Sequence, residues 1–284
     1  MPFAREALVV SAVACASPTA HAQASYTLAP VADVTLYESA SGAAANGAGE
    51  HLFTGLTLRN ASLRRCLLRF DLSSIAPGEV IVGARLRMEV TRSNGGPADL
   101  RLHRASAPWS QGASNAFEPG GQGTDPAPGD ATWIHRAWPS AFWATPGGEF
   151  SSVVSASALS DGVGPIEWTA GPVMLADLEA WRSDPSQNFG WLIESIGTDT
   201  NSARCLASRE NVTPSVRPVL EIETLPLCAA CRADFNCDGG VDGDDVIAFF
   251  AEWDENLIGA DVTDDGLVDG DDVIAFFARW DAGC

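Results

Sequence analysis

Two stretches near the end of the chain carry oxygen-bearing side chains at the same spacing. The stretches are residues 234–254 and 261–281, and the run VDGDDVIAFFA is identical in both. Each begins with twelve residues in which positions 1, 3, 5, 9 and 12 carry an oxygen-bearing side chain and position 6 is glycine. Oxygens in this order are the ligands that calcium takes from a single tight loop. The pattern therefore predicts two calcium ions, each bound by one loop.

The predicted ligands follow from this spacing, which is that of the EF-hand loop. Position 7 contributes a backbone carbonyl, and position 12 must offer both of its carboxylate oxygens. Position 12 is aspartate in both loops, one methylene shorter than the usual glutamate, so we expect the following helix to lie close to the ion. The predicted ligands are Asp234, Asn236, Asp238, Gly240, Asp242 and Asp245 in the first loop and Asp261, Thr263, Asp265, Leu267, Asp269 and Asp272 in the second.

An apolar helix is predicted after each loop, over Val246–Trp253 and Val273–Trp280. In both segments valine, two phenylalanines and tryptophan recur at i, i+3, i+4 and i+7, which is one face of a helix. No helix is predicted before either loop, because residues 229–233 are too few to form one. Each loop is therefore followed, but not preceded, by a helix.

A calcium loop followed by one helix, present twice, resembles the dockerin family. Dockerins are small modules that attach secreted polysaccharide-degrading proteins to cohesin receptors. The final Gly283-Cys284, with Cys231 before the first loop, resembles the dockerins that end in Gly-Cys. Loop positions 10 and 11 are Gly-Asp in both copies, where cellulosomal dockerins carry Ser-Thr-like recognition residues. The resemblance implies calcium binding and a cohesin-like or cell-surface receptor as partner, but not a cellulosomal cohesin.

Negative charge is concentrated in the same C-terminal segment. The 284 residues have a net charge of −20, and residues 228–284 hold 15 acidic and 2 basic residues, a net of −13. The remaining −7 is spread over the rest of the chain, and all 17 basic residues are arginine. This balance argues against nucleic acid and anionic membranes as partners.

The first 22 residues have the composition of a secretory signal. Arg5 supplies a positive charge, residues 7–16 are apolar, and Ala20-His21-Ala22 matches a cleavage site. The apolar run is too short to cross a bilayer, and no later segment is a predicted membrane span. We therefore expect a secreted or cell-surface protein whose mature chain begins near Gln23.

Export changes how the cysteines are interpreted. An even number of cysteines in an exported chain favours disulfides. Two of them lie in strand-like runs, and a bridge between neighbouring strands is predicted for this pair, Cys66 and Cys205. In the acidic segment, Cys284 is expected to pair with Cys231 or Cys228 and so hold together a module with little core. The six candidates are Cys66, Cys205, Cys228, Cys231, Cys237 and Cys284.

Residues 23–223 have the pattern of an all-β domain. In Ala84–Val90 apolar and charged residues alternate, which places them on opposite faces of a strand. Pro172–Arg182 has helical spacing with proline in its first turn, and we expect it to pack over a sheet end. Many short runs separated by turn residues favour a β-sandwich or jelly roll. The predicted strands are Thr35–Glu38, Leu52–Leu58, Cys66–Leu72, Val80–Thr91, Leu100–His103, Gly190–Ser195, Ala203–Ser208 and Pro218–Glu223.

The predicted organisation is therefore a signal at residues 1–22, a β domain at 23–223, a linker at 224–230 and a calcium-binding module at 231–284. The expected fold class is mainly β, in a jelly roll or sandwich, with a small all-α module at the C-terminus.

Six short segments of the β domain share the pattern of one known family. They are Leu67–Ser73 (LLRFDLS), Ala84–Val90, Trp109-Ser110, Asp130–Trp133, Ser208–Glu210 and Arg217–Leu220. Together they resemble the DNRLRE domains, a jelly-roll family related to carbohydrate-binding module family 96. The resemblance implies polysaccharide binding, in some members of acidic polysaccharides such as alginate. Without lysine, an acidic sugar would have to be met by arginines such as Arg59, Arg64 or Arg65.

An aromatic segment at residues 132–150 follows a long Gly/Pro/Ser-rich stretch. Irregular segments of this length are often functional. Its tryptophans are candidates for a platform on which sugar rings stack; the alternative is that the aromatic side chains plug the end of the sandwich. The four residues are Trp133, Trp138, Phe142 and Trp143.

No catalytic pattern stands out in the sequence. Glycosidases need two carboxylates across a cleft, and the spacing of Asp130, Glu149, Glu167 and Glu194 marks no pair. The histidines are isolated, and the nucleophile and metalloprotease motifs are absent. We therefore expect a non-catalytic secreted module that binds polysaccharide or is structural. The alternatives are a polysaccharide hydrolase or lyase with its carboxylates in residues 110–170, and an adhesive surface protein without sugar specificity.

Overall fold

The computed structural model describes residues 24–58, 61–76, 78–196, 202–226 and 231–283. These fall into two compact units, the β unit at residues 23–225 and the C-terminal unit beginning at Pro226. The predicted secretory signal at residues 1–22 lies outside the described residues.

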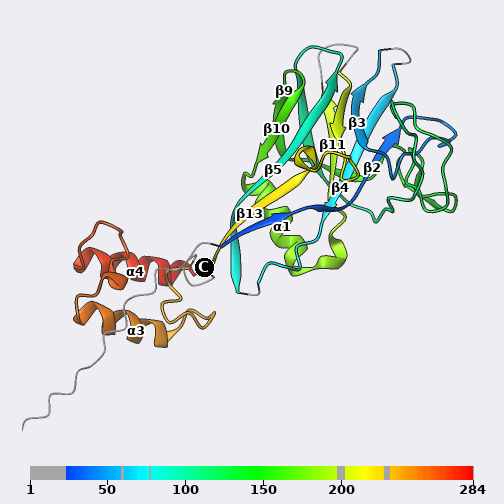
Figure 1. The fold of residues 1–284 in the computed structure, drawn as a ribbon. Helices are drawn as coiled ribbons and strands as arrows, with labels where there is room; N and C mark the ends of the chain where they lie inside the picture. The colour runs from blue at the N-terminus through cyan, green and yellow to red at the C-terminus, as the bar shows by residue number, and fades with distance from the viewer. Residues whose placement is uncertain (1–23, 59–60, 77, 197–201, 227–230, 284) are drawn as a thin grey trace, which may run out of the picture. The chain divides into compact units, whose positions relative to one another are not determined.

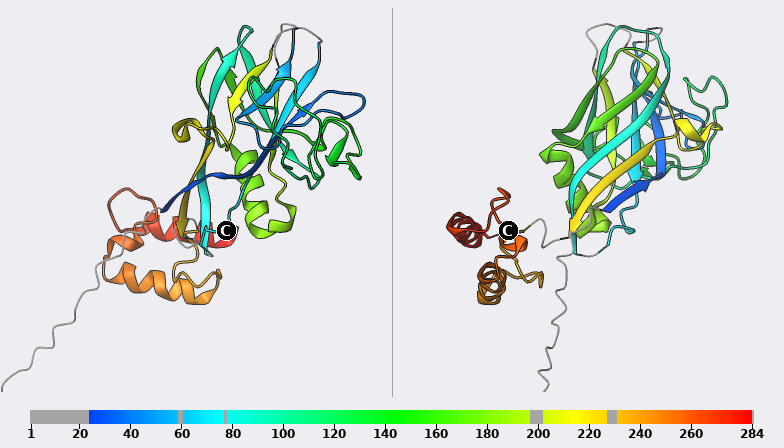
Figure 2. Two further views of the ribbon diagram at one scale, coloured as in Figure 1. Left: turned by 45° about the vertical axis from the view of Figure 1, so that its right-hand side comes forward. Right: turned by 60° about the vertical axis from the view of Figure 1, so that its left-hand side comes forward.

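A curled antiparallel sheet makes up most of the β unit (Figures 1 and 2). The strand order is β1-β13-β5-β12-β3-β4-β11-β6-β9, with β10 beside β5 and β2 beside β4. A separate short ribbon joins β7 and β8. The strands are β1 Ala24–Leu28, β2 Pro30–Tyr37, β3 His51–Leu56, β4 Leu63–Phe70, β5 Glu79–Ser93, β6 Ala98–Ala105, β7 His135–Ala137, β8 Ala141–Phe142, β9 Phe150–Ser160, β10 Gly164–Thr169, β11 Trp191–Ile196, β12 Arg204–Ala207 and β13 Val219–Pro226. The mainly β fold class is confirmed.

The core of the β unit lies inside the curl. The predicted alternation in β5 is confirmed, since Leu86, Met88 and Val90 are buried in the main apolar cluster. Two tryptophans from facing strands, Trp168 and Trp191, are fully buried in the same cluster. The indole nitrogen of Trp168 donates a hydrogen bond to the Leu100 carbonyl at 2.8 Å, so its polar group is not left unpaired.

The predicted helix is present as α1, Pro172–Ser183, with proline at its first turn. Its buried face contains Met174, Leu178 and Trp181, which pack into the main cluster. The buried carboxylate of Asp177 accepts a hydrogen bond from the Trp191 indole nitrogen at 3.0 Å. Short 3-10 helices follow at Pro185–Gln187 (η1) and Pro214–Val216 (η2).

The end of the β unit differs from the prediction. Strand β13 continues to Pro226, and Thr224 is paired with Ala24 of β1. Residues 224–226 are therefore strand and not linker. The ladder with β1, a strand absent from the prediction, is the physical reason for the extension.

The C-terminal unit contains two helices, α3 Gly243–Asp254 and α4 Gly270–Ala282 (Figure 1). A short 3-10 helix, η3 Ile258–Ala260, precedes the second loop. Phe249 and Phe276 are fully buried and stack with their ring centroids 4.3 Å apart and their planes at 3°. Both helices begin three residues earlier than predicted, because aspartates cap them.

Candidate functional site

Each predicted loop ends in the N-terminus of its helix. Asp242 and Asp269, at loop position 9, are the N-cap residues of α3 and α4. In both loops the position-12 carboxylate accepts a hydrogen bond from the N-cap backbone, from Asp242 to Asp245 at 2.8 Å and from Asp269 to Asp272 at 2.9 Å. This reciprocal capping box holds two predicted ligands at the positive end of the helix dipole.

The carboxylate at position 1 organises the rest of each loop. Asp234 accepts the backbone N–H of Asp238 and of Gly239, both at 3.0 Å. Asp261 accepts the equivalent groups, at 3.2 Å from Asp265 and 2.8 Å from Gly266. The two loops thus use the same hydrogen bonds, as expected of two copies of one structural solution.

The backbone turns sharply where the sequence places glycine. Gly239 and Gly266, at position 6, have φ of +90° and +86°, a region that side chains other than glycine rarely adopt. Position 4 also has positive φ, at Cys237 and Asp264. The spacing predicted the first of these turns but gave no signal for the second.

Four predicted ligands are buried carboxylates. Asp234, Asp245, Asp261 and Asp272 are each at most 6% exposed. Burial raises the pKa of Asp272, but the backbone N–H groups of Asp269 and Thr263 lower it more, and its pKa lies below the ordinary value. In the described part of the chain, the basic side chain that pairs with a loop carboxylate is Arg232, which lies 2.6 Å from the exposed Asp264.

The loop residues fit calcium for two reasons. Their donor atoms are oxygens, and most of their negative charge is not paired with a basic side chain in the described part of the chain. Buried carboxylates without a cation are costly, and a divalent ion bound to oxygen offsets the cost. Within the described residues, no three His, Cys, Asp or Glu side chains already converge as a ligand group. Here the carboxylates are turned towards loop N–H groups. Calcium would be held by Asp234, Asp238 and Asp245 in the first loop and by Asp261, Asp265 and Asp272 in the second, with the other predicted positions completing each set.

A pair of reciprocal hydrogen bonds connects the two halves of the C-terminal unit. The indole nitrogen of Trp253 in α3 donates to the Asp269 carbonyl at 3.0 Å. The indole nitrogen of Trp280 in α4 donates to the Asp242 carbonyl at 3.2 Å. Each helix therefore contacts the predicted calcium loop of the other repeat.

The cysteines differ from the prediction. Cys66 and Cys205 are free thiols, so the predicted bridge between them is wrong. Strand β3 lies between β4 and β12 in the sheet, and two strand spacings, roughly 9.5 Å, exceed the reach of a disulfide. Cys231 is disulfide-bonded. The other two predicted partners, Cys228 and Cys284, lie outside the described residues, and Cys237 is exposed in the first loop.

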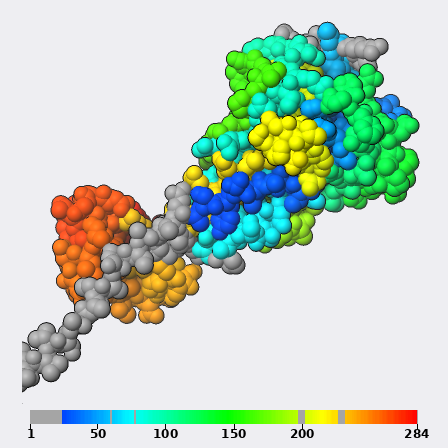
Figure 3. Space-filling view, viewed as in Figure 1, coloured from blue at the N-terminus to red at the C-terminus, as the bar shows by residue number. Residues whose placement is uncertain are grey.

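The aromatic segment supplies fewer exposed rings than a sugar platform needs. Trp133 and Trp143 are buried in a second apolar cluster, and the Trp143 indole donates to the Thr132 carbonyl at 2.9 Å. These two tryptophans pack in the interior of the β unit, so their assignment to a sugar platform is wrong. Trp138 is half-buried and Phe142 is exposed. In Figure 3 the surrounding segment, coloured green, forms a continuous surface at one end of the β unit.

The four carboxylates considered for catalysis are engaged separately. Asp130 is buried and accepts three backbone N–H groups, and Glu149 accepts that of Ala144 at 2.7 Å. Glu167 lies 3.4 Å from Arg85. Glu194 lies 3.4 Å from His103 and 3.5 Å from Arg65, and its interactions, first with His103, lower its pKa.

Asp33 and Glu210 form a carboxylate pair that the sequence pattern does not predict. Burial and the neighbouring Glu210 raise the pKa of Asp33 well above its ordinary value. The backbone N–H of Arg209 donates to Asp33 at 2.8 Å, and the Arg209 guanidinium lies 3.0 Å from Glu210. One Glu210 oxygen is buried without a hydrogen-bond partner. The motif Ser208–Glu210 gives no sign of this contact, because Asp33 and Arg209 are 176 positions apart in the sequence.

The β unit has a cavity of about 600 Å³ beside α1, at the end of β4. Polar side chains from the LLRFDLS segment, Arg69, Asp71 and Ser73, face it. Arg182, Asn188 and the largely buried Trp181 also line it. Such a mixture of hydrogen-bonding and apolar residues is typical of a small-molecule site.

The arginines predicted to meet an acidic sugar are placed differently. Arg64 is almost fully buried, and the guanidinium of Arg65 donates to the Gly147 carbonyl at 3.0 Å. Arg59 lies outside the described residues. The candidate cations for an acidic sugar are instead Arg69 and Arg182, because both line the cavity beside α1.

Comparisons with known proteins add no family. No family model matches the chain, and no curated protein sequence matches it. Among the described helices, none combines the length and the apolar character needed to cross a bilayer.

Proposed function

We propose that this protein is a secreted, non-catalytic module that binds polysaccharide or builds a surface structure, and that its C-terminal unit binds two calcium ions and tethers it. We also propose that the C-terminal unit is a dockerin-like module and that the β unit is a jelly roll of the DNRLRE type. One observation carries it: two loops repeat the same hydrogen bonds around buried carboxylates that form no ion pair with a basic side chain among the described residues.

Tethering is supported by apolar side chains on the outside of the C-terminal unit. Ile247 and Ile274 occupy equivalent positions in the two repeats and are 69% and 70% exposed. Ile258 and Leu267 are also exposed. Exposed apolar side chains at four positions of one small unit favour a protein partner, here a cohesin-like or cell-surface receptor.

Polysaccharide binding is supported by the cavity beside α1. Its two arginines and Asp71 can form charge-assisted hydrogen bonds with hydroxyl and carboxylate groups of a sugar. The arginines favour an acidic polysaccharide over a neutral one.

Titration calorimetry of the full chain tests calcium binding. We expect two binding events, and none after Asp234 and Asp261 are both replaced by alanine. Replacing the exposed Asp244 and Asp271, which are not predicted ligands, is the matched control and should leave both events. No heat of binding at millimolar calcium would overturn the proposal.

Affinity electrophoresis on a panel of polysaccharides, with product analysis, tests the β unit. Retardation without products supports a binding module, products support the hydrolase or lyase alternative, and neither supports a structural protein. Arg69→Ala should weaken retardation, since a charged hydrogen bond contributes about 1.5–3 kcal/mol. Arg85→Ala, on the exposed face of β5, should not.

A further inference from the structure

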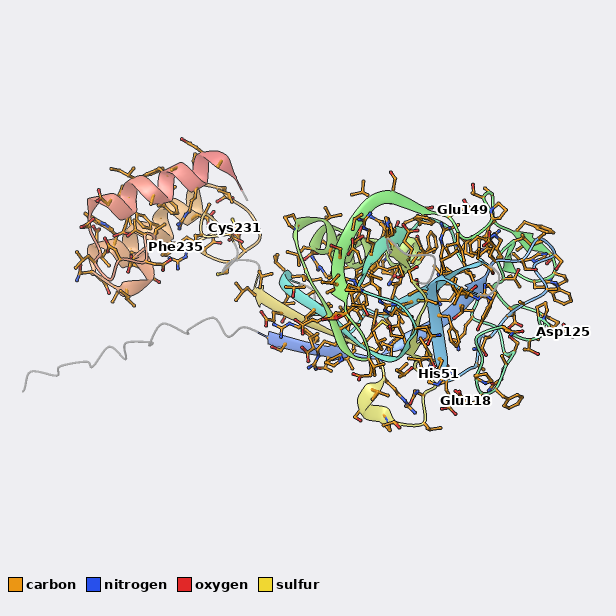
Figure 4. All side chains as sticks on the ribbon, turned by 90° about the horizontal axis from the view of Figure 1, so that it is seen from above. His51, Glu118, Asp125, Glu149, Cys231 and Phe235 are labelled. Carbon is orange, nitrogen blue, oxygen red and sulfur yellow. The ribbon has the colours of Figure 1, made fainter. Side chains whose placement is uncertain are left out.

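A cysteine, a histidine and a glutamate meet on the β unit. Cys205 of β12 is opposite Phe53 of β3, so His51 is its diagonal neighbour on the same face of the sheet. The His51 Nε2 atom lies 2.6 Å from a Glu118 oxygen, and Figure 4 labels these two residues beside each other. Its other ring nitrogen, Nδ1, is buried without an aligned hydrogen-bond partner. Thiol, imidazole and carboxylate in this order are the parts of an activated nucleophile.

The charges around the pair favour thiolate and imidazolium. Interaction with the Cys205 side chain raises the pKa of His51 against the effect of burial, and Glu118 adds to the increase. Burial raises the pKa of Cys205, but His51, Thr91 and the charge of Arg92 outweigh it, and the pKa of the thiol falls below its ordinary value. The Thr91 hydroxyl lies 3.2 Å from the sulfur and can donate to it.

Cys66 provides a contrast within the same unit. It is fully buried in β4, and burial is the main reason why its pKa lies far above the ordinary value. The titratable and charged groups that interact with Cys205 come from four strands and are His51 of β3, Arg92 of β5, Tyr37 of β2 and Cys66 of β4, with Glu118 on the far side of His51. The charge of Arg92 acts on Cys205, whereas the described groups that act on Cys66 are Asp33 and Cys205.

Cys205 is 4% exposed and lies at the wall of a cavity. This cavity has a volume of about 290 Å³ and is also lined by Arg64, Arg92 and Arg204. The described residues that line it include no aspartate or glutamate, and Glu118 lies 3.4 Å from Arg92. Arg204 is fully buried and its guanidinium donates to the Ser160 hydroxyl and to backbone carbonyls. In a chain of net charge −20, Arg64 and Arg92 are therefore the lining cations that favour a small anionic ligand.

We propose that Cys205, His51 and Glu118 form a nucleophilic thiol site that exchanges with small disulfides carrying carboxylate groups. His51 takes the thiol proton, and the Cys205 thiolate attacks one sulfur of the disulfide. The sulfur–sulfur bond of the small molecule breaks, a new one forms to Cys205, and the leaving thiolate takes the proton from His51. Glu118 is a positioning residue, which orients the ring and stabilises its positive charge. The site does not depend on calcium.

Alkylation of the full chain by iodoacetamide as a function of pH tests the thiol. We expect peptide mapping by mass spectrometry to show Cys205 modified at least about tenfold faster than Cys66 at pH 7, with a midpoint below that of a free cysteine near 8.5. If Cys205 reacts no faster than a peptide of the same sequence, or its midpoint is not lowered, the proposal is wrong.

Two variants test the roles of the other residues. His51→Gln should move the midpoint up to or above that of free cysteine, and Glu118→Gln should move it part of the way. The Glu118 side chain is 58% exposed, so this second variant is expected to fold even if the first does not. Glu167→Gln, an exposed carboxylate on β10, is the control and should leave the profile unchanged. An unchanged profile in the His51 and Glu118 variants would refute the triad.

The ligand class is tested with two disulfide probes of opposite charge. The rate of each probe with Cys205 is divided by its rate with a peptide of the same sequence, because the two leaving thiolates differ in reactivity. This ratio should be higher for dithiobis(nitrobenzoate) than for cystamine, and added salt or Arg92→Gln should narrow the difference between the two ratios. Equal ratios for the anionic and the cationic probe would contradict the preference for carboxylates.

Discussion

The aspartates at loop positions 1 and 12 act as hydrogen-bond acceptors and as predicted ligands at once. Asp234 and Asp261 each bind two loop N–H groups, so their loss should disorder a loop as well as remove an oxygen. We expect Asp234→Ala to weaken the first calcium site and Asp261→Ala the second, each at least tenfold, about 1.4 kcal/mol. Calorimetry of the single variants checks which event is lost. Loss of both events from one variant would contradict independent loops.

The third loop position distinguishes the two sites. Asn236 offers an amide oxygen, whereas Thr263 offers a hydroxyl that lies 3.3 Å from an Asp261 oxygen. We expect the first loop to bind calcium more tightly, and Thr263→Asn to bring the second closer to it. The converse change, Asn236→Thr, should bring the first closer to the second. A gain in affinity from Asn236→Thr would reverse this ranking of ligands.

The buried carboxylate of Asp33 should make the β unit sensitive to pH. Its pKa is raised by folding, so the native state binds its proton more tightly than the unfolded chain does. The stability from this group is present at low pH and is lost as the pH rises from the ordinary pKa, about 3.9, through the raised one. Relative to Asp33→Asn, the wild-type melting temperature should therefore fall between pH 4 and pH 8. Asp125→Asn, at an exposed site, should show no such trend.

Residue-level prediction was possible where the partners are close in sequence. The predicted loop ligands follow a twelve-residue spacing, and both copies have the same hydrogen bonds around position 1. Arg209 and Asp33 are 176 positions apart, and no local pattern links them. The same holds for Cys205 and His51, which the ladder of two strands brings together. A site whose residues are brought together by the tertiary fold leaves no pattern in the spacing of those residues along the sequence.

At the scale of elements, the two helices depend on a very small core. Phe249 is fully buried against Phe276, whereas Ile247 on the same helix is exposed. We expect Phe249→Ala to cost about 3–5 kcal/mol, enough to unfold a unit of this size without calcium. Ile247→Ala is the matched control and should change stability by less than about 0.5 kcal/mol. Helicity measured by far-UV circular dichroism, with and without calcium, separates the two outcomes.

The strands show the limits of pattern reading. Strand β5 was predictable because Leu86, Met88 and Val90 alternate with charged residues. Strand β9 was not, because its sequence FSSVVSASALS is rich in serine and alanine and has no such alternation. Its place at the end of the sheet, beside β6, is decided by pairing and not by propensity. The prediction of a sugar platform at residues 132–150 failed for a related reason, since sequence spacing cannot distinguish a buried tryptophan from an exposed one.

At the scale of the whole molecule, the two units should respond differently to calcium. A ligand that binds only the folded state stabilises it by about 2.7 kcal/mol at 100 times its Kd. We expect calcium to raise the melting transition of the C-terminal unit and to leave that of the β unit unchanged. Calorimetric scans with calcium and with chelator check this. An equal shift of both transitions would mean that calcium binds elsewhere.

The reciprocal tryptophan bonds in the C-terminal unit also bear on its origin. Trp253 reaches the Asp269 carbonyl as Trp280 reaches that of Asp242, and the central phenylalanines stack on each other. Contacts of this kind, in which residue i meets j′ and j meets i′, are those of an isologous two-fold dimer. A chain with a single repeat would thus offer a second copy of itself the surface that the fused repeats now share. Tandem duplication would then have turned a concentration-dependent assembly into an intramolecular one.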